Sequence, residues 1–262
     1  MGGRGGKSNL TRPSAVPVPP MLQPQQPPIS QQPPDDSNTP VQLDALDALT
    51  GMADAQLAQF FADSQQTDLP NHLGDVNDIT QKFVFAAGLN SKPEVLDAAE
   101  FKQFMADNNI PQSEILSRSI NGGTLRTSTG STRNLTAQQV ADMAMYSRLN
   151  YIGGKHGGQA YGAGTYFDMN GGGNTGYASG MTLNAVLNPK TARIITDHAL
   201  RAKAAAFDKS HPAFAKATGG YRTSFRNNNM SVYALVLGYN VIKDASGSYH
   251  NIIDRSALVY RK

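Results

Sequence analysis

The sequence predicts an α+β fold that follows a disordered tail, and three observations lead to this prediction. Residues 1–40 hold ten of the fifteen prolines and few apolar residues that could be buried. Apolar side chains then recur at helical spacing through much of residues 41–145. Short strand-like runs come mainly after residue 181 and do not alternate regularly with helices. Helices first and strands later are typical of α+β proteins.

Composition excludes several classes of protein. The 262 residues include no cysteine, which excludes a disulfide scaffold, a thiolate zinc site, a cysteine nucleophile and a redox CxxC motif. A net charge of +3 is too small to indicate wholesale nucleic-acid binding. No run of about 18 apolar residues occurs, so we expect no membrane contact. The first thirty residues lack an apolar signal core, so we do not expect an ordinary secreted protein.

Residues 1–40 form a Gly-, Pro- and Gln-rich tail that opens with MGGRGGKS. Such a composition buries too little apolar surface to offset its ordering entropy, so we expect a solvated, disordered tail. The start resembles a myristoylation signal, but Gly6 stands where that signal has Ser or Thr. The alternative is that the basic tip contacts nucleic acid or a capsid surface.

Residues 41–64 read as one acidic amphipathic helix, followed by a linker to residue 77. The apolar positions recur at three- and four-residue steps: Leu43, Leu46, Leu49, Ala53, Leu57, Phe60 and Phe61. Residues 41–80 contain seven Asp and no Lys or Arg. The helix is therefore either a docking element for a partner or a part of the main domain's packing.

Residues 78–262 are the predicted globular domain. Helices are expected from residue 78, from Pro93, from the Thr136 cap to Met145, and from Asp197 to about Phe207. Strands are expected at residues 113–120, 182–187, 192–195, 232–237, 251–253 and 257–260.

Charge is uneven along the chain. Residues 181–262 carry twelve Lys or Arg against four Asp, so this region and the acidic front either attract each other or bind different partners. A weaker interpretation is nucleic-acid binding, since basic and aromatic residues alternate only at Tyr221-Arg222 and Phe225-Arg226.

Common catalytic motifs are absent from the sequence. The segment around Lys155 lacks P-loop spacing, Gly162 and Gly164 lack the third glycine of a dinucleotide fingerprint, and there is no HExxH or GxSxG. The remaining candidates are Arg118, on an apolar strand, and Tyr166, in a segment where residues 153–180 hold eleven glycines.

These two segments, in this order, carry a family resemblance. Residues 115–120 (ILSRSI), 161–168 (YGAGTYFD) and 175–178 (TGYA) resemble the Arg strand, the Gly-rich Tyr-Phe stretch and the following helix of ADP-ribosyltransferases. Residues 238–242 and 251–258 resemble the closing strands of transferase-like proteins encoded by tailed bacteriophages, and the MGGRGG opening is similar to those of phage head-associated proteins. The resemblance implies an α+β fold with an ADP-ribosyltransferase-like split β-sheet core and flanking helices.

The resemblance also implies roles for individual residues, with NAD as the substrate. Arg118 would anchor a phosphate or ribose, Tyr166 would stack on nicotinamide, and Ser117 or Ser119 would add a hydroxyl to the ribose. The residues implied to bind NAD are Arg118, Ser119, Gly162, Gly164, Tyr166, Tyr177 and His250. Cleavage of the nicotinamide–ribose bond builds positive charge on the sugar, so holding and orienting NAD is the main task.

One departure from the family concerns its late-strand glutamate, because the last glutamate of this chain is Glu114. His250 falls near the expected position and Asp254 is the nearest carboxylate, so the implied catalytic set is Arg118, Tyr166 and Asp254. Asp254 is otherwise a strand-end residue paired with Arg255 at the surface. Asp168 also lies just past the Tyr.

Two functions are expected from this resemblance. The first is a phage-encoded mono-ADP-ribosyltransferase that modifies a host protein or nucleic acid in the host cytoplasm. The alternative is a catalytically inactive virion or head-assembly protein with the same fold, whose residues 1–64 contact head or portal proteins.

Overall fold

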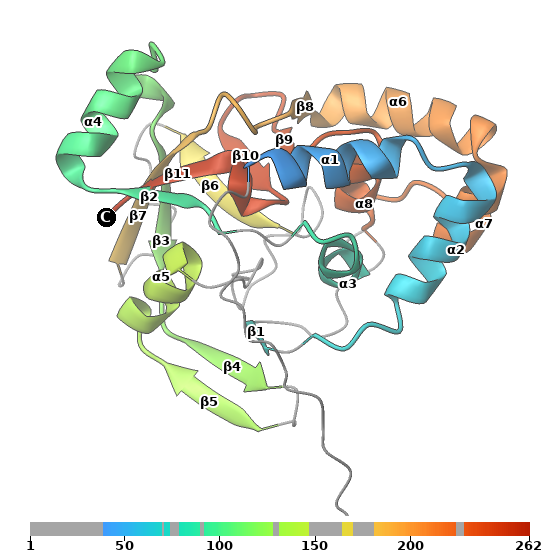
Figure 1. The fold of residues 1–262 in the computed structure, drawn as a ribbon, viewed down its shortest axis with the longest axis horizontal. Coiled ribbons are helices and arrows are strands. Elements are labelled where there is room, and N and C mark those ends of the chain that lie inside the picture. Colours follow the sequence, from blue (N-terminus) through green and yellow to red (C-terminus); the bar gives the residue numbers. More distant parts are fainter. Residues whose placement is uncertain are drawn as a thin grey trace, which may run out of the picture. The chain divides into compact units, whose positions relative to one another are not determined.

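The computed structural model describes residues 39–69, 71–73, 79–89, 92–127, 131–146, 164–169, 181–223 and 228–262. These residues form a mixed α+β structure, as the sequence predicts (Figure 1). The predictions for the tail, for Gly162 and for Tyr177 lie outside the described residues.

An eight-stranded sheet has the order β2-β11-β7-β3-β6-β10-β9-β8. Its strands are β2 (Glu94–Leu96), β3 (Leu116–Ile120), β6 (Thr165–Met169), β7 (Met181–Leu187), β8 (Ile194–Thr196), β9 (Val241–Lys243), β10 (Tyr249–Ile252) and β11 (Leu258–Arg261). The β2–β11 and β8–β9 pairs are parallel, and the other pairs are antiparallel. A three-stranded sheet, absent from the sequence prediction, contains β1 (Asn71–Leu73), β4 (Gly123–Thr127) and β5 (Thr132–Leu135).

The large sheet splits between its two central strands. The ladder between β3 and β6 contains only the pairs Leu116–Met169 and Ser117–Asp168. Beyond them β3 continues along β7 as far as Ile120, whereas β6 continues along β10 as far as Thr165. The two halves of the sheet therefore diverge from Arg118 onward.

Alternation of side chains gives the sheet two different faces. One face, called here the α5 face, packs on the helix α5 (Ala137–Tyr146), which begins after the predicted Thr136 cap. Its cluster combines strand and helix residues, among them Leu116, Ile120, Phe167, Leu183, Val140, Ala141 and Ala144.

The opposite face is called here the polar face, because the central strands present polar side chains on it. At one end the helix α4 (Ala98–Asp107) covers it, with Phe101 and Met105 packed on Val186 and Val259. At the other end Ile195 and Ile242 join the core of a helical layer. The polar face is thus bounded by apolar packing at both ends.

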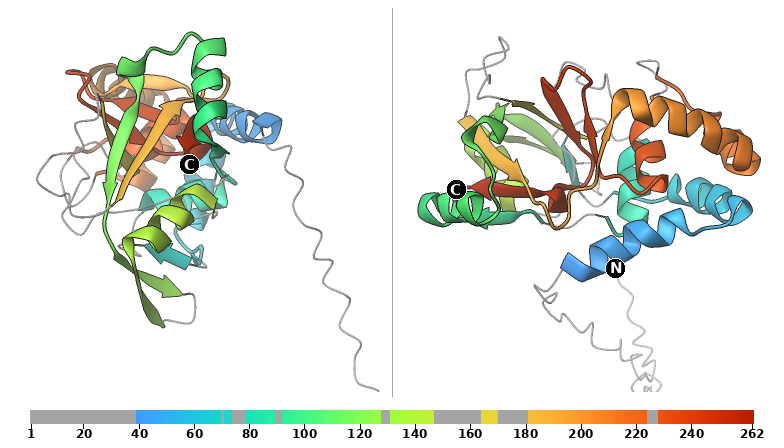
Figure 2. Two further views of the ribbon diagram at one scale, coloured as in Figure 1. Left: turned by 90° about the vertical axis from the view of Figure 1, so that its left-hand side faces the viewer. Right: turned by 90° about the horizontal axis from the view of Figure 1, so that it is seen from above.

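The helical layer lies beside the sheet, as the views in Figures 1 and 2 agree. It contains α1 (Thr39–Thr50), α2 (Asp54–Ser64), α3 (Ile79–Ala86), α6 (Asp197–Ser210), α7 (Pro212–Thr218) and α8 (Met230–Val236). Its largest side chains include Phe61, Phe83, Phe214 and Tyr233, which pack on one another at edge or tilted angles. In the part of the chain that is described, no helix is long and apolar enough to cross a membrane.

The prediction of a single helix over residues 41–64 is wrong, because the helix is interrupted at Gly51-Met52-Ala53, between α1 and α2. Leu46 and Leu49 of α1 and Leu57 of α2 are buried in the core of the helical layer. Of the two alternatives for this segment, the structure therefore shows packing on the main domain.

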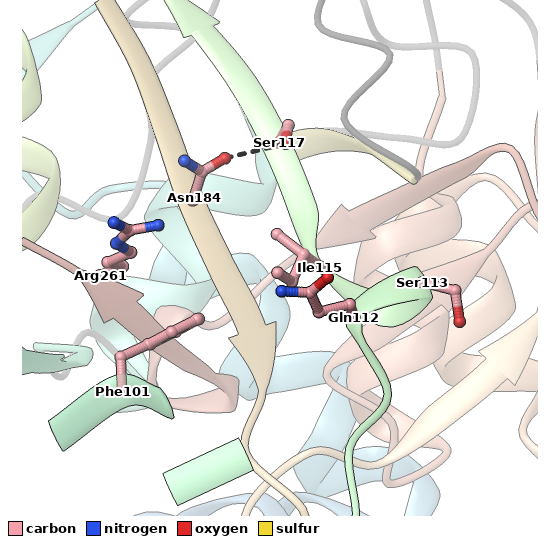
Figure 3. Close-up of a pocket in the computed structure, with 7 residues that line it drawn as sticks. All are labelled: Phe101, Gln112, Ser113, Ile115, Ser117, Asn184 and Arg261. Carbon is pink, nitrogen blue, oxygen red and sulfur yellow. Dashed lines mark hydrogen bonds between the residues drawn. The ribbon is translucent and has the colours of Figure 1, made fainter. Parts of the chain in front are cut away.

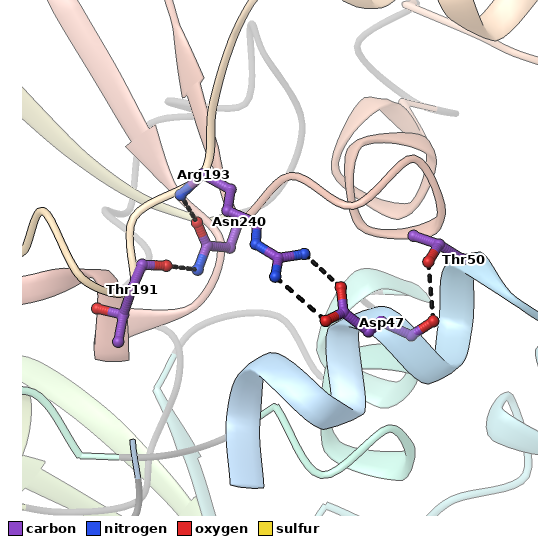
Figure 4. Close-up of polar contacts among 5 residues, drawn as sticks. All are labelled: Asp47, Thr50, Thr191, Arg193 and Asn240. Atoms are coloured by element: carbon purple, nitrogen blue, oxygen red, sulfur yellow. Dashed lines mark hydrogen bonds and ion pairs between the residues drawn. The ribbon is translucent and has the colours of Figure 1, made fainter. Parts of the chain in front are cut away.

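One ion pair links the acidic front of the chain to its basic back. Both terminal guanidinium nitrogens of Arg193, Nη1 and Nη2, contact the Asp47 carboxylate, at 2.5 and 3.2 Å (Figure 4). The Arg193 guanidinium holds the pKa of Asp47 below its usual range. Asn240 fixes the main chain that leads into Arg193, because it accepts from the Arg193 N–H and donates to the Thr191 carbonyl. The two oppositely charged regions therefore attract each other at this point.

Two further predictions of secondary structure are wrong. No helix begins at Pro93, because residues 94–96 pair with β11 and the Asp97 side chain caps α4 by accepting from the N–H groups of Ala99 and Glu100. Residues 232–237 are not a strand, because residues 230–236 form the helix α8. All seven residues of this helix are buried. A helix surrounded by core on every side shows no amphipathic period, so its short apolar run resembles a buried strand.

Candidate functional site

Arg118 lies where the sheet splits, and its side chain bridges the two halves. Its Nη1 donates a hydrogen bond of 2.9 Å to the main-chain carbonyl of Tyr166. Arg118 shares its side of β3 with Leu116 and Ile120, both in the cluster on the α5 face. This contact gives Arg118 a structural role at the split.

Tyr166 projects to the other side of the sheet. Its neighbour Phe167 is buried on the α5 face, so alternation places Tyr166 and Asp168 on the polar face. Ser117 and Ser119 of β3 face the same way, since they alternate with Arg118. The structure thus brings Tyr166 and Ser119 to one face and Arg118 to the opposite one.

The strand register aligns five polar side chains across the polar face. Each of these residues is paired with the next on the neighbouring strand, in the order Arg261, Asn184, Ser117, Asp168 and Tyr249. Directly opposed side chains have Cβ atoms about 5 Å apart, so neighbours in this row are in contact range. Ser117 Oγ donates to Asn184 Oδ1 at 2.9 Å. We call these five residues the polar row.

Asp168 is the carboxylate of the polar row. Burial raises its pKa above the ordinary value, and the positive charge of Arg118 opposes that rise. A carboxylate beside serine hydroxyls and a half-buried tyrosine provides acceptors and donors for the hydroxyls of a sugar. Each residue of the row lies more than 50 residues along the chain from the residue with which it pairs, and Asn184 and Arg261 carried no signal in the sequence.

An open pocket of about 420 Å³ adjoins the Arg261 end of the polar row (Figure 3). It is lined by Phe101, Gln112, Ser113, Ile115, Ser117, Asn184 and Arg261. Gln112 and Ser113 belong to the short 3-10 helix η1 (Gln112–Glu114), where the predicted strand over residues 113–120 has not yet begun.

Gly164 has a packing role. A Cβ atom at this position would lie 1.9 Å from Asn251 Oδ1 and 2.9 Å from the carbonyl oxygen of Ile252. Only glycine permits this close approach of the chain to β10. The space beside Gly164 is therefore filled by Asn251.

His250 is buried on the α5 face, opposite Phe167. Burial lowers its pKa to about 4, so the ring is neutral at pH 7. Its Nδ1 has no hydrogen-bond partner within the described residues. His250 and Tyr166 thus lie on opposite faces of the sheet.

Asp254 and Arg255 are buried rather than paired at the surface. The Asp254 carboxylate accepts from Ser256 N–H at 3.2 Å and from Ser256 Oγ at 2.7 Å, which caps the 3-10 helix η2 (Arg255–Ala257). Burial raises the pKa of Asp254 to about 6. Arg255 donates from Nη1 to the carbonyls of Met143 and Ala144 near the end of α5. Both residues have hydrogen-bond partners that belong to the fold.

The part of the chain that the structure describes contains no group of three or more His, Asp or Glu that could hold a metal ion. No protein-family model, curated protein or solved structure matches this chain. Fold and site together define a mixed α+β protein whose open sheet face carries a polar row beside a pocket.

Proposed function

We propose that this protein is an ADP-ribosyltransferase-like enzyme that binds NAD on the polar face of its split sheet. The observation that carries the proposal is the common direction of Tyr166 and Asp168 on β6 and of Ser117 and Ser119 across the split on β3. Further support comes from the arrangement of the strands, because the segments that carry the resemblance form β3, β6 and β10, which are consecutive neighbours in the sheet.

The polar face supplies the chemistry that this reaction needs. The bond between nicotinamide and ribose breaks with positive charge developing on the sugar, and a nearby carboxylate stabilises that charge. We assign this task to Asp168, in place of the family's late-strand glutamate. Tyr166 stacks on nicotinamide, and the Ser119 hydroxyl holds the ribose. The acceptor, a host protein or nucleic acid, attacks the ribose carbon and gives up a proton. Nicotinamide is the leaving group of this step.

Arg118 is a positioning residue in this proposal. Its bond to the Tyr166 carbonyl fixes the separation of β3 and β6, and with it the distance between Ser119 and Tyr166. An arginine fits this task because its planar guanidinium spans a gap between strands and stays charged.

The second candidate function is an inactive head-assembly protein of a phage particle. One observation favours it: β10 reads Tyr249-His250-Asn251-Ile252, so no carboxylate occupies the late strand next to β6. Asp254, which follows this strand, is bound to Ser256. In this alternative the fold serves as a scaffold and the polar face contacts other virion proteins.

Calorimetry with NAD and chromatography of released nicotinamide test the proposal on the full chain. We expect micromolar binding by the wild type, a loss of at least tenfold in affinity for Tyr166→Ala, and loss of nicotinamide release for Asp168→Asn. Tyr146→Ala is the matched control, because Tyr146 is an exposed tyrosine at the end of α5. Absence of NAD binding by the folded wild type overturns the enzyme proposal in favour of the scaffold.

A further inference from the structure

The proposed reaction assigns no ligand to the pocket at the Arg261 end of the polar row. The pocket holds about 420 Å³, which lies in the range of about 300–1,000 Å³ found for small-molecule sites. Ser117 and Asn184 belong both to the pocket lining and to the polar row. A ligand in the pocket is therefore continuous with whatever lies over Asp168.

Arg261 is the one charged residue among the seven that line the pocket. It is exposed, and within the described residues its guanidinium has neither a hydrogen-bond acceptor nor an ion-pair partner. The pairing of β11 with Asn184 of β7 and with Leu96 of β2 fixes the main chain of Arg261. A guanidinium that lines a pocket, with its donors available, is suited to a phosphate group.

The rest of the lining suits a planar ring with hydrogen-bonding edges. Phe101 and Ile115 provide apolar contact, and Phe101 is itself anchored in the packing of α4 on the sheet. Gln112 and Asn184 provide side-chain amides, which read the edges of a base with one donor and one acceptor each. Because Asn184 Oδ1 accepts from Ser117, its NH₂ group is left to donate.

We propose that this pocket binds a nucleoside monophosphate, with the phosphate on Arg261 and the base between Phe101 and the two amides. The assignment rests on the proposed function in one respect: in NAD, the ligand is the adenosine monophosphate half. Asn184 and Asp168 are separated by β3 alone, so their strands lie about 10 Å apart. One dinucleotide then reaches from Arg261 to Tyr166 along the polar row.

Calorimetric titrations with adenosine monophosphate, nicotinamide mononucleotide and NAD test the assignment. Arg261→Gln is the test variant, and Lys262→Gln is the matched control, since it removes the same charge one residue away without lining the pocket. We expect Arg261→Gln to weaken adenosine monophosphate and NAD by roughly tenfold or more, because a charge-assisted hydrogen bond is lost. Nicotinamide mononucleotide binding and the Lys262→Gln variant keep wild-type affinities.

The outcomes separate this inference from the proposed function. If Arg261→Gln binds all three ligands as Lys262→Gln does while Tyr166→Ala loses NAD, the pocket assignment is overturned and NAD binding on the polar face stands. If the wild type binds adenosine monophosphate through Arg261 but not NAD, the pocket stands and the proposed enzyme falls. Absence of adenosine monophosphate binding by the wild type overturns the pocket assignment directly.

Discussion

The two faces of the split sheet hold polar groups under opposite conditions. On the side that packs against α5, Arg118 and Arg255 donate to main-chain carbonyls, and His250 is buried and neutral. On the polar face, Asp168 and Arg261 belong to a row beside an open pocket. Charged side chains therefore have two different roles in this sheet: on the α5 face they stabilise the fold, and on the polar face they are available to a ligand.

The largest effect on stability is expected from Arg255, the largest fully buried side chain among the residues that the structure describes. Arg255→Met keeps much of the volume but leaves the carbonyls of Met143 and Ala144 without their donor. We expect the free energy of unfolding to fall by about 3 kcal/mol, as for other broken buried polar contacts. Urea denaturation followed by circular dichroism measures the change.

Arg261→Gln on the polar face is the control for this comparison. Arg261 is exposed and lacks a partner among the described residues, so we expect a change within about 0.5 kcal/mol. Equal losses for the two arginine variants would mean that the faces do not differ in the way described.

The next prediction concerns Asp254 and the pH dependence of stability. Burial raises the pKa of Asp254 to about 6, whereas the unfolded chain has a pKa of about 3.9. The native state holds the proton more tightly between these values, so this group lowers stability as pH rises from about 4 to 6, by about 3 kcal/mol in total. Asp254→Asn removes that fall, and urea midpoints from pH 4 to 7 reveal it.

His250 has the opposite sign in the same pH range. Burial lowers its pKa to about 4 against about 6.5 in the unfolded chain, so the unfolded state binds the proton more tightly. Stability from this group rises with pH across that interval, by about 3 kcal/mol. We therefore expect His250→Asn and Asp254→Asn to tilt the stability profile in opposite directions. Parallel profiles for the two variants and the wild type would contradict both assignments.

Gly164 is expected to show a smaller loss. Gly164→Ala forces the new methyl group against the Asn251 amide and the Ile252 carbonyl, which costs about 2 kcal/mol as in other overpacked sites. Gly51→Ala is the matched control, because its nearest neighbour would lie 3.6 Å away. Thermal unfolding of both variants measures the difference, and a wild-type midpoint for Gly164→Ala would show that this strand end shifts freely.

Much of the fold was predictable wherever one side of a helix or strand faces solvent. The amphipathic spacing that predicts α5 and α6, and the apolar run that predicts β7, are confirmed. Elements buried on all sides escaped the pattern, as α8 did, and the hairpin of β4 and β5 offers too little apolar alternation to be seen. For such elements, length and cap residues distinguish a helix from a strand. Asp97 with Glu100 was a recognisable capping box at the start of α4.

The site was harder to predict than the fold, because a site on a sheet depends on register. Arg118 and Tyr166 were both visible as unusual residues, but alternation along β3 and β6 places them on opposite faces. Asn184 and Arg261 joined the polar row only through pairings across more than 60 residues of chain. A single sequence without pairing information does not contain that register.

The smallest effect on stability and the sharpest effect on activity are expected together at Asp168. Asp168→Asn on the open polar face changes the free energy of unfolding by no more than about 0.5 kcal/mol, yet it removes the charge assigned to the ribose. Because burial raises the pKa of Asp168, wild-type nicotinamide release begins to rise at a higher pH than an ordinary aspartate would give. Glu114→Gln, an exposed carboxylate of η1, keeps the wild-type rate and pH profile. A stability loss at Asp168 as large as that at Arg255 would show that this carboxylate stabilises the fold. The difference between the two faces would then apply to the pocket alone.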